Sequence, residues 1–221
     1  MKHEGDYLRR LQSGSLSGEE IAELLSDRRA RKFHVVRRAL AAHPRTPRVE
    51  ALTILGTLFW RDLAWISADA KAHPEIRRAA EREIFKRMPF LARAEKADLA
   101  RCAGRGVLAA LRREDDPDIV GSILRNRLTV EADIVQLAAG SRNAGNLVAI
   151  LADLAWGVRS AVQTAVARNA ATPLVTAVGL LSVIPLADVR EIAGERWRPA
   201  ELLQAARAEV LCRLEGGARV V

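Results

Sequence analysis

The chain repeats itself, and this feature constrains its fold more than any other. Shifted by 126 residues, the segment 21–84 aligns with the segment 147–210 without a gap, and 16 of the 64 aligned pairs are identical. Repetition of this kind is typical of architectures in which successive units pack on their neighbours. The identical pairs include Leu25/Leu151, Asp27/Asp153, Val36/Val162, Thr46/Thr172, Pro47/Pro173, Asp62/Asp188, Ile66/Ile192, Ala79/Ala205, Ala80/Ala206 and Glu83/Glu209.

A shorter period lies within this repeat. The pattern that begins at Arg125-Asn126 and ends at Thr129 recurs 43 residues later, ending at Thr172, and Pro89 lies 42 residues after Pro47. A marker therefore falls near residues 46, 88, 129 and 172. This spacing predicts about four degenerate units of roughly 42 residues, each a pair of helices stacked as a solenoid.

The markers have a physical interpretation. Thr46 and Thr172 each precede a proline, Pro47 or Pro173. Threonine is a good N-cap, and proline fits the first helical position, where a missing N–H costs nothing. Asn126 and Asn169 stand where a preceding helix must stop, a position that asparagine tolerates. Asp62 and Asp188 recur before short apolar stretches, and we expect both to be N-caps; Asp27 and Asp153 are expected to be structural corner residues.

Apolar spacing predicts helices and no strands. The sets Phe33, Val36, Leu40 and Ile76, Ala79, Ala80, Ile84 recur at helical intervals, and no stretch alternates as a half-buried strand would. The set Val49, Leu52, Leu55, Leu58 is expected to be another buried stripe. Ser17 to Glu20 matches a capping box. Further helices are expected to start near Asp62, Pro74, Glu95, Pro117, Asn143 and Pro199.

The organisation along the chain indicates one domain. No internal segment is rich enough in Pro, Gly or Ser to separate residues 1–215, and residues 216–221 are expected to fray as a tail. The uncharged run Asn169–Ala187 contains two prolines and matches a charged segment of the repeat, so we interpret it as buried helices and expect no membrane partner. Without a secretory signal the chain is expected in the cytoplasm. Cys102 and Cys212 are expected to be small buried side chains without a disulfide.

Charge is distributed unevenly. Residues 1–113 hold 24 Lys and Arg against 14 Asp and Glu, whereas residues 114–221 hold 11 against 13. The segment 28–48 carries eight basic residues and no acid. Such a field attracts phosphates or acidic partners, although a basic solvated helix face would have the same composition. The candidate binding residues are Arg31, Lys32, Arg37, Arg38, Arg45 and Arg48, followed by Arg77, Arg78 and Arg82.

The segment 162–181, VQTAVARNAATPLVTAVGLL, resembles the leucine-rich repeat variant proteins, which carry a valine–alanine helix, then Arg-Asn, Thr-Pro and a leucine helix. The corner from Asp153 to Arg159 is similar to that of HEAT repeats. The resemblance covers most of residues 20–212, and the unit around 88–113 departs from it, with Met88 in place of the threonine. It implies a right-handed, HEAT- or armadillo-like superhelix of helix pairs that binds macromolecules. Some of these proteins hold an iron–sulfur cluster through N-terminal cysteines, but no cysteine precedes Cys102, so no cofactor is expected.

The sequence offers no recognisable catalytic apparatus. The four histidines are scattered, and no metal-binding, phosphate-loop or nucleophile motif is present. His43 and His73 precede prolines and are expected to be capping residues. One enzymatic analogy is with HEAT-like alkylpurine DNA glycosylases, for which Asp153, Trp156 and Arg159 could supply a concave site if they were helical.

Three functions therefore remain open. The first is a non-enzymatic scaffold that binds an acidic protein partner through the basic N-terminal half, with Trp60 or Trp65 as possible anchors. The second is nucleic-acid binding through phosphate contacts. Few aromatic residues lie among the basic ones, so stacking on the bases of a single strand is poorly supported. The glycosylase is the third and least favoured.

Overall fold

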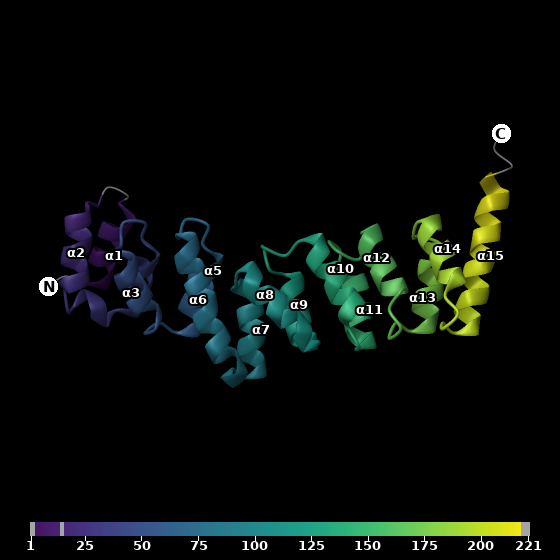
Figure 1. Cartoon of the computed structure of the whole chain (residues 1–221), viewed down its shortest axis with the longest axis horizontal. Coiled ribbons are helices and arrows are strands. Elements are labelled where there is room, and N and C mark those ends of the chain that lie inside the picture. The colour runs from purple at the N-terminus through teal and green to yellow at the C-terminus, as the bar shows by residue number, and fades with distance from the viewer. Residues whose placement is uncertain (1–2, 14–15, 218–221) are drawn as a thin grey trace. The chain divides into compact units, whose positions relative to one another are not determined.

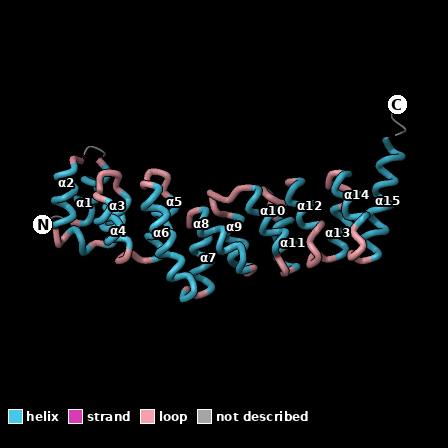
Figure 2. The backbone as a smooth tube through the Cα atoms, viewed as in Figure 1, coloured by secondary structure: helices cyan, strands magenta, loops and turns pink. Residues whose placement is uncertain are grey.

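The computed structural model describes residues 3–13 and 16–217, which form short α-helices joined by turns, with no strand among these residues (Figures 1 and 2). The all-α expectation is confirmed. The α-helices of the described residues are α1 (Glu4–Gln12), α2 (Gly18–Ser26), α3 (His34–Ala42), α4 (Arg48–Leu55), α5 (Trp60–Ala68), α6 (Pro74–Arg87), α7 (Arg93–Cys102), α8 (Arg105–Leu111), α9 (Pro117–Leu124), α10 (Glu131–Gly140), α11 (Ala144–Ala152), α12 (Ser160–Ala167), α13 (Leu174–Leu180), α14 (Leu186–Gly194) and α15 (Ala200–Gly217). Three 3-10 turns are η1 (Ala30–Lys32), η2 (Met88–Phe90) and η3 (Arg112–Glu114).

The helices follow the predicted repeat closely. Helices α2 to α6 begin at residues 18, 34, 48, 60 and 74, and α11 to α15 begin at 144, 160, 174, 186 and 200, each 126 residues later. The markers lie between α3 and α4, α6 and α7, α9 and α10, and α12 and α13. Consecutive markers therefore enclose three helices, and the prediction of helix pairs is wrong. We call these sets triplets: α1–α3, α4–α6, α7–α9, α10–α12 and α13–α15.

The predicted helix boundaries are largely confirmed. Ser17 caps α2, and Ser17 and Glu20 form the expected capping box. Pro74 and Pro117 are the first residues of α6 and α9, and Asn143 is the N-cap of α11.

Each triplet is closed by a side chain near the end of its third helix, which donates to main-chain carbonyls near the end of its first helix or, in the first triplet, to Leu16 O just before α2. In the third triplet the buried Asn126 Nδ2 donates to Ala100 O at 2.8 Å and Ala103 O at 3.1 Å, and in the fourth Asn169 Nδ2 donates to Ser141 O at 2.8 Å. These carbonyls lack helical partners, because a helix leaves its last carbonyls unpaired. The remaining closing hydrogen bonds run from Arg45 to Leu16 O, from Arg87 to Gly56 O and Leu58 O, and from Arg213 to Leu181 O and Ile184 O.

The marker threonines end helices and do not start them. Thr46 Oγ1 donates to Leu40 O at 2.6 Å, Thr129 Oγ1 to Ile123 O at 2.7 Å, and Thr172 Oγ1 to Val166 O at 2.6 Å. Each hydroxyl thus satisfies a carbonyl of the preceding helix. The N-caps of α4 and α13 are Pro47 and Pro173, so the predicted threonine caps with proline at the first helical position are corrected by one residue.

The contribution of the Thr172 hydroxyl to the free energy of unfolding should be measurable. Replacing Thr172 with Val removes the hydroxyl but keeps the branched shape, and takes away one hydrogen bond of the Val166 carbonyl, which still accepts from Asn169 N at 3.0 Å. We expect a loss of about 0.5–1.5 kcal/mol in the free energy of unfolding, measured by urea denaturation. Thr172→Ser keeps the donor and should lose less; equal losses for both variants would contradict the role given to the hydroxyl.

Asp62 and Asp188 are the third residues of α5 and α14, whose N-caps are Phe59 and Pro185. The expectation that they are N-caps is therefore wrong. Asp62 Oδ1 lies 3.4 Å from Arg38 NH1, and Asp188 Oδ2 accepts from Thr164 Oγ1 at 3.1 Å. Since 38 and 164 are also 126 apart, the aspartates serve equivalent contacts to the preceding triplet.

The buried face of α4 differs from the predicted stripe. Val49 is 74% exposed and Leu52 is 39% exposed, whereas Ala51, Ile54 and Leu55 are buried. Four residues at intervals of three rotate progressively around a helix of 3.6 residues per turn, so they cannot share one face. Of the predicted set only Leu55 and Leu58, which follows α4, are buried, so an interval of three does not mark the buried face of this helix.

The described helices gather into two compact units. Unit 1 holds the chain up to Leu108 together with Asn126–Leu128, and unit 2 holds Ala109–Arg125 and the chain from Thr129 onward. Each closing hydrogen bond joins residues of the same unit. One domain over residues 1–215 stays a prediction. Helix α15 runs to Gly217 and residues 218–221 lie outside the described residues, so a frayed tail over 216–221 also stays a prediction.

Candidate functional site

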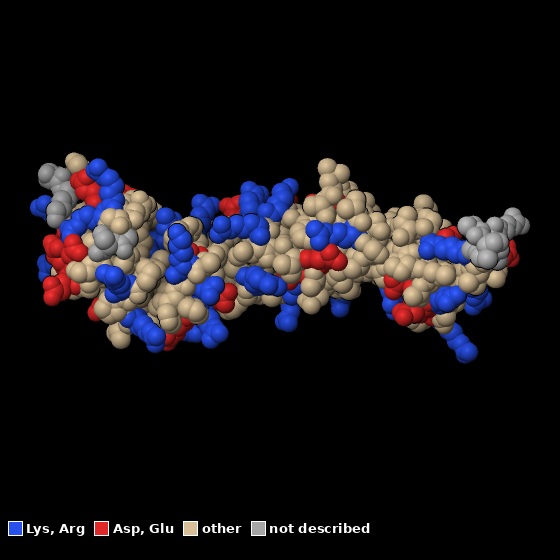
Figure 3. All heavy atoms as spheres, turned by 90° about the horizontal axis from the view of Figure 1, so that it is seen from above, with Lys and Arg blue, Asp and Glu red and all other residues tan. Residues whose placement is uncertain are grey.

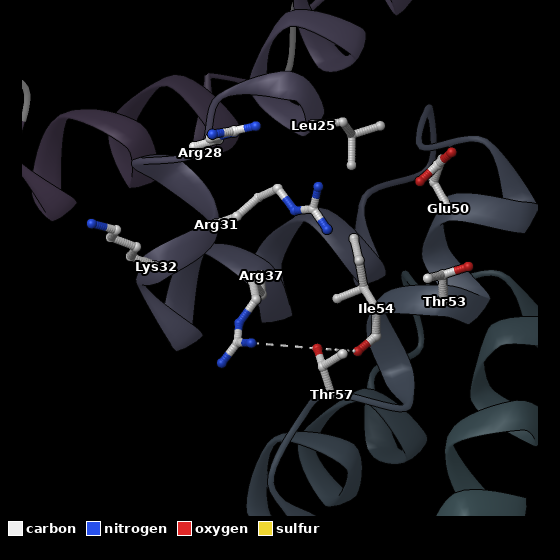
Figure 4. A pocket seen from close by; sticks show the side chains of 9 residues that line it. All are labelled: Leu25, Arg28, Arg31, Lys32, Arg37, Glu50, Thr53, Ile54 and Thr57. Atoms are coloured by element: carbon white, nitrogen blue, oxygen red, sulfur yellow. Dashed lines mark hydrogen bonds between the residues drawn. The ribbon is translucent and has the colours of Figure 1, made fainter.

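The first candidate site is a groove in unit 1 between the corner that precedes α3 and the face of α4. Its volume is about 320 Å³ (Figure 4). The corner positions its basic residues because Asp27 Oδ1 accepts the main-chain N–H groups of Arg29 and Ala30 and so fixes the turn that leads into η1. The groove is lined by Leu25, Arg28, Arg31, Lys32, Arg37, Glu50, Thr53, Ile54 and Thr57.

The cations of this groove lack carboxylate partners. Among the described residues, no ion pair within 4.0 Å engages Arg28, Arg31, Lys32 or Arg37, although Glu50 lines the same groove. Arg37 NH1 lies 3.5 Å from the Thr57 hydroxyl, while its Nε is buried without a hydrogen-bond partner (Figure 4). A buried donor without an acceptor is costly, and an incoming oxygen would relieve that cost.

A second cleft in unit 1 repeats this arrangement. Its volume is about 290 Å³, and its lining includes Arg77, Arg78, Arg105 and Glu81. Arg77 is the fourth residue of α6, as Arg37 is of α3, and its Nε is likewise buried without a partner. Arg37 and Arg77 thus occupy equivalent places in consecutive triplets, whereas the opposite walls differ: residues of α4 face Arg37, and Arg105 of α8 with Leu128 faces Arg77.

The other predicted binding residues are held within the fold. Arg38 pairs with the buried Asp62 and lies over the Trp65 ring at 4.8 Å from its centroid. Arg45 forms the closing hydrogen bond of the first triplet. Arg48 pairs with Glu75 at 3.2 Å.

Of the nine predicted binding residues, the groove thus unites Arg31, Lys32 and Arg37, and the second cleft unites Arg77 and Arg78. Arg82 is exposed on α6 outside both linings. Arg28 and Arg105 were missed as binding residues. Arg28 begins the basic segment, which is a usable signal, but no sequence pattern places Arg105 beside α6.

The second copy of the repeat shows which cations the fold requires. At the positions 126 residues after the eight basic residues of the segment 28–48 there is no charged side chain. Those eight positions hold Leu154, Ala155, Gly157, Val158, Gln163, Thr164, Ala171 and Leu174. Helices α11, α12 and α13 nevertheless begin where the repeat places them. The same helix arrangement thus forms without these cations.

The surface charge agrees with this comparison. Lys and Arg are dense over the N-terminal part of the face that Figure 3 presents. In the second copy, Leu154 and Val158 stand where Arg28 and Lys32 stand in the first, and they are 91% and 72% exposed. The segment 154–174 keeps Arg159 and Arg168, which pair with Glu131 and Glu191.

Unit 2 contains a larger cleft of about 670 Å³, lined by Arg112, Arg113 and Arg142 together with Asp115. Arg112 pairs with Asp133 at 2.5 Å. Burial raises the pKa of Asp115, but hydrogen bonds from Ser141, Asn146 and the Arg142 main chain more than offset this and keep the pKa below its ordinary value. With one arginine paired and one ionised carboxylate in the lining, this cleft holds less unpaired positive charge than the groove of unit 1.

The residues of the glycosylase analogy are engaged in structure. Asp153 Oδ1 accepts the main-chain N–H groups of Ala155 and Trp156, which confirms its corner role. Trp156 Nε1 donates to Leu124 O at 3.0 Å, and Arg159 lies over the indole and pairs with Glu131. The three residues lie in the turn between α11 and α12, and the helical arrangement considered from the sequence is wrong.

The tryptophans proposed as anchors differ in exposure. Trp60 is half-buried, donates through Nε1 to Glu95 at 3.2 Å and packs under Arg61. Trp65 keeps an exposed edge beside Arg38. Only Trp65 therefore offers ring surface next to the cations of unit 1.

The histidines at the corners accept main-chain hydrogen bonds. His43 Nδ1 accepts from Arg45 N and His73 Nδ1 from Glu75 N, as expected for capping residues. Burial, and secondarily the Arg45 guanidinium, lowers the pKa of His43, which keeps the ring neutral at pH 7 and able to accept. In the described ranges no group of three or more His, Cys, Asp or Glu could hold a metal ion.

The cysteines are exposed, so the expectation that they are buried is wrong. Cys102 ends α7 and Cys212 lies on the outer side of α15, and both thiols are free. Burial of part of the side chain, with Asp98 nearby, raises the pKa of Cys102. Over the part of the chain that the structure describes, no helix combines the length and apolarity needed to cross a membrane.

Comparisons with protein-family models, curated proteins and solved structures find no match to this chain.

Proposed function

We propose that the chain is a non-enzymatic scaffold, an α-solenoid of the HEAT- or armadillo-like type, that binds an acidic protein partner. The groove between the α3 corner and α4 is the principal site, and the separate cleft along α6 is a second one. The observation that carries this proposal is the difference between the two copies of the repeat: the first holds eight cations at positions where the second holds none. Of these eight, Arg28, Arg31, Lys32 and Arg37 line the groove without a carboxylate partner among the described residues, so these four are available for a partner.

Two separate clefts suit the acidic side chains of a protein better than the continuous phosphate backbone of a nucleic acid. Binding along a nucleic-acid backbone needs a continuous row of free cations. Here Arg38 and Arg48 are neutralised by carboxylates and Arg45 is held by a carbonyl, which interrupts the row. What remains are two separate clefts whose linings include apolar side chains such as Ile54 and Leu128. Apolar side chains beside arginines are typical of protein interfaces.

The supporting experiment is fluorescence anisotropy with a labelled poly-glutamate peptide, a labelled DNA duplex and a labelled single strand, at two salt concentrations. We expect the peptide to bind with a Kd in the micromolar range that rises with salt, because exposed ion pairs are screened. DNA that binds about tenfold more tightly than the peptide, with a steep salt dependence, would make nucleic acid the partner class. No binding of any probe at low salt would reject the groove as an anion site.

A further inference from the structure

We propose that the chain forms a two-fold symmetric dimer through the outer face of α14 and α15, with α15 of a second copy lying antiparallel across α15. This surface belongs to unit 2 and does not depend on the proposed function, which uses the basic groove of unit 1.

The repeat shows what the corresponding face does in unit 1. Helices α5 and α6 pack along each other as α14 and α15 do, and α7 packs on α5. At this contact the Ser67 hydroxyl accepts from Gly104 N at 3.0 Å, and Gly104 lies so close to the Ser67 carbonyl that a Cβ would stand 2.5 Å from it. Ala64 and Ile84 are fully buried there. The face of α5 and α6 is therefore a docking surface for a helix.

The equivalent face of α14 and α15 lies open within the described ranges and keeps small residues at two positions. Ala193 and Gly194 stand 126 residues after Ser67 and Ala68, whereas Arg190 stands where the first copy has the buried Ala64. With Arg190, Arg207, Val210 and Leu211 the two small residues line a cleft of about 400 Å³. Leu211 is 58% exposed and Leu214 is also exposed, so α15 presents apolar side chains outward.

The exposed stripe of α15 is complementary to itself. It consists of Arg207, Ala208, Leu211, Leu214 and Glu215, at helical intervals along one side. If two copies cross antiparallel with the two-fold axis at Leu211, Arg207 faces Glu215 of the second copy. Ala208 then faces Leu214 of the second copy, a small side chain opposite a large one. Each contact occurs twice, as an isologous interface requires.

The charges of this stripe are free to form the pairs. Within the described residues neither Arg207 nor Glu215 takes part in an ion pair, whereas the neighbouring Glu209 and Arg213 pair with each other at 2.7 Å. Arg207 replaces Glu81 of the first copy, so the sign of the charge at this position is reversed relative to the face that α7 and α8 cover. The second copy supplies the matching carboxylate.

The decisive experiment uses the full chain with a reductant, in sedimentation equilibrium from micromolar to near-millimolar concentration. The parent is expected to show a monomer–dimer equilibrium. Arg207→Glu and Glu215→Arg should each be monomeric, because each places like charges opposite one another twice. An equal mixture of these two variants should restore dimers, since every facing pair is then of opposite sign.

Two further variants separate the interface from the fold. Leu211→Glu should weaken dimerisation at least about tenfold, as expected for a charge buried at the axis. Phe85→Glu changes the counterpart of Leu211 in the first copy and should dimerise like the parent. A parent that stays monomeric over the whole range, or a mixture that fails to restore dimers, overturns the proposal; in the first case another protein is the occupant of the face. Variants of the unit 1 groove should dimerise normally, so the two proposals can fail separately.

Discussion

Replacing Arg31, Lys32 and Arg37 together with glutamate is expected to raise the Kd for the poly-glutamate peptide by about a hundredfold or more. Each lost contact between an exposed cation and a carboxylate costs about 1 kcal/mol, and three correspond to about two powers of ten, before the repulsion of the new charges is added. The three residues line one groove and have no carboxylate partner among the described residues, so the fold should persist. Anisotropy measures the affinity, and thermal unfolding followed by circular dichroism measures the fold.

A matched control keeps the net charge change equal. Arg101, Arg125 and Arg127 are exposed and lie outside both unit 1 clefts, and their replacement with glutamate should change the Kd by only a few-fold. Equal losses in the two triple variants would mean that only net charge attracts the peptide. A gentler variant, Arg28→Leu with Lys32→Val and Arg37→Gln, introduces the residues of the second copy. It should fold like the parent and still bind the peptide about tenfold more weakly.

Asn126→Ala is expected to lower the free energy of unfolding by about 3 kcal/mol, the largest effect that we expect from a single polar side chain outside the groove. The amide makes three buried or half-buried hydrogen bonds: it donates to Ala100 O and Ala103 O and accepts from Leu128 N at 2.8 Å. Alanine would leave three main-chain groups without partners. Chemical denaturation measures the loss.

Asn143→Ala provides the comparison for this variant. Asn143 accepts only the Gly145 N–H at the start of α11 and is half-buried, so we expect a loss of about 1 kcal/mol, typical of an N-cap. Two equal losses would show that the closing hydrogen bonds contribute no more than an ordinary cap. A larger loss for Asn126→Ala supports their role in fixing the segment 126–128 to the end of α7.

The repeat predicted the positions of the helices correctly, whereas their grouping into pairs was wrong. The 126-residue shift places the starts of α2 to α6 and α11 to α15 correctly, because capping and breaking residues recur with the repeat. Between residues 46 and 88 the expected starts near Pro47, Asp62 and Pro74 correspond to α4, α5 and α6, so only the grouping into pairs was wrong there. Helix α8 was missed because it begins at Arg105, directly after Ala103 and Gly104, without a proline. Apolar spacing alone cannot separate two short helices joined by such a turn.

The sequence predicts that the site is positively charged, but it does not predict which arginines line the groove. Runs of basic residues are visible in sequence, but the partners of each guanidinium depend on tertiary contacts. Arg38 and Arg48 find carboxylates 24 and 27 residues further along, which no local pattern indicates. Arg37, one position before Arg38 on α3, faces the groove instead, since neighbouring helical residues point about 100° apart.

The closing hydrogen bonds have a consequence for how such a chain can diverge. Their acceptors are main-chain carbonyls, which every amino acid supplies, so substitution at Ala100, Ser141 or Ile184 leaves the acceptor in place. Only the donor, an Asn or an Arg, has to be retained or exchanged for the other. The rest of each unit is then free to drift, which accounts for two copies that differ at 48 of 64 positions while their helices stay in step. The binding residues at one corner can therefore change during evolution while the closing hydrogen bonds of the triplets are kept.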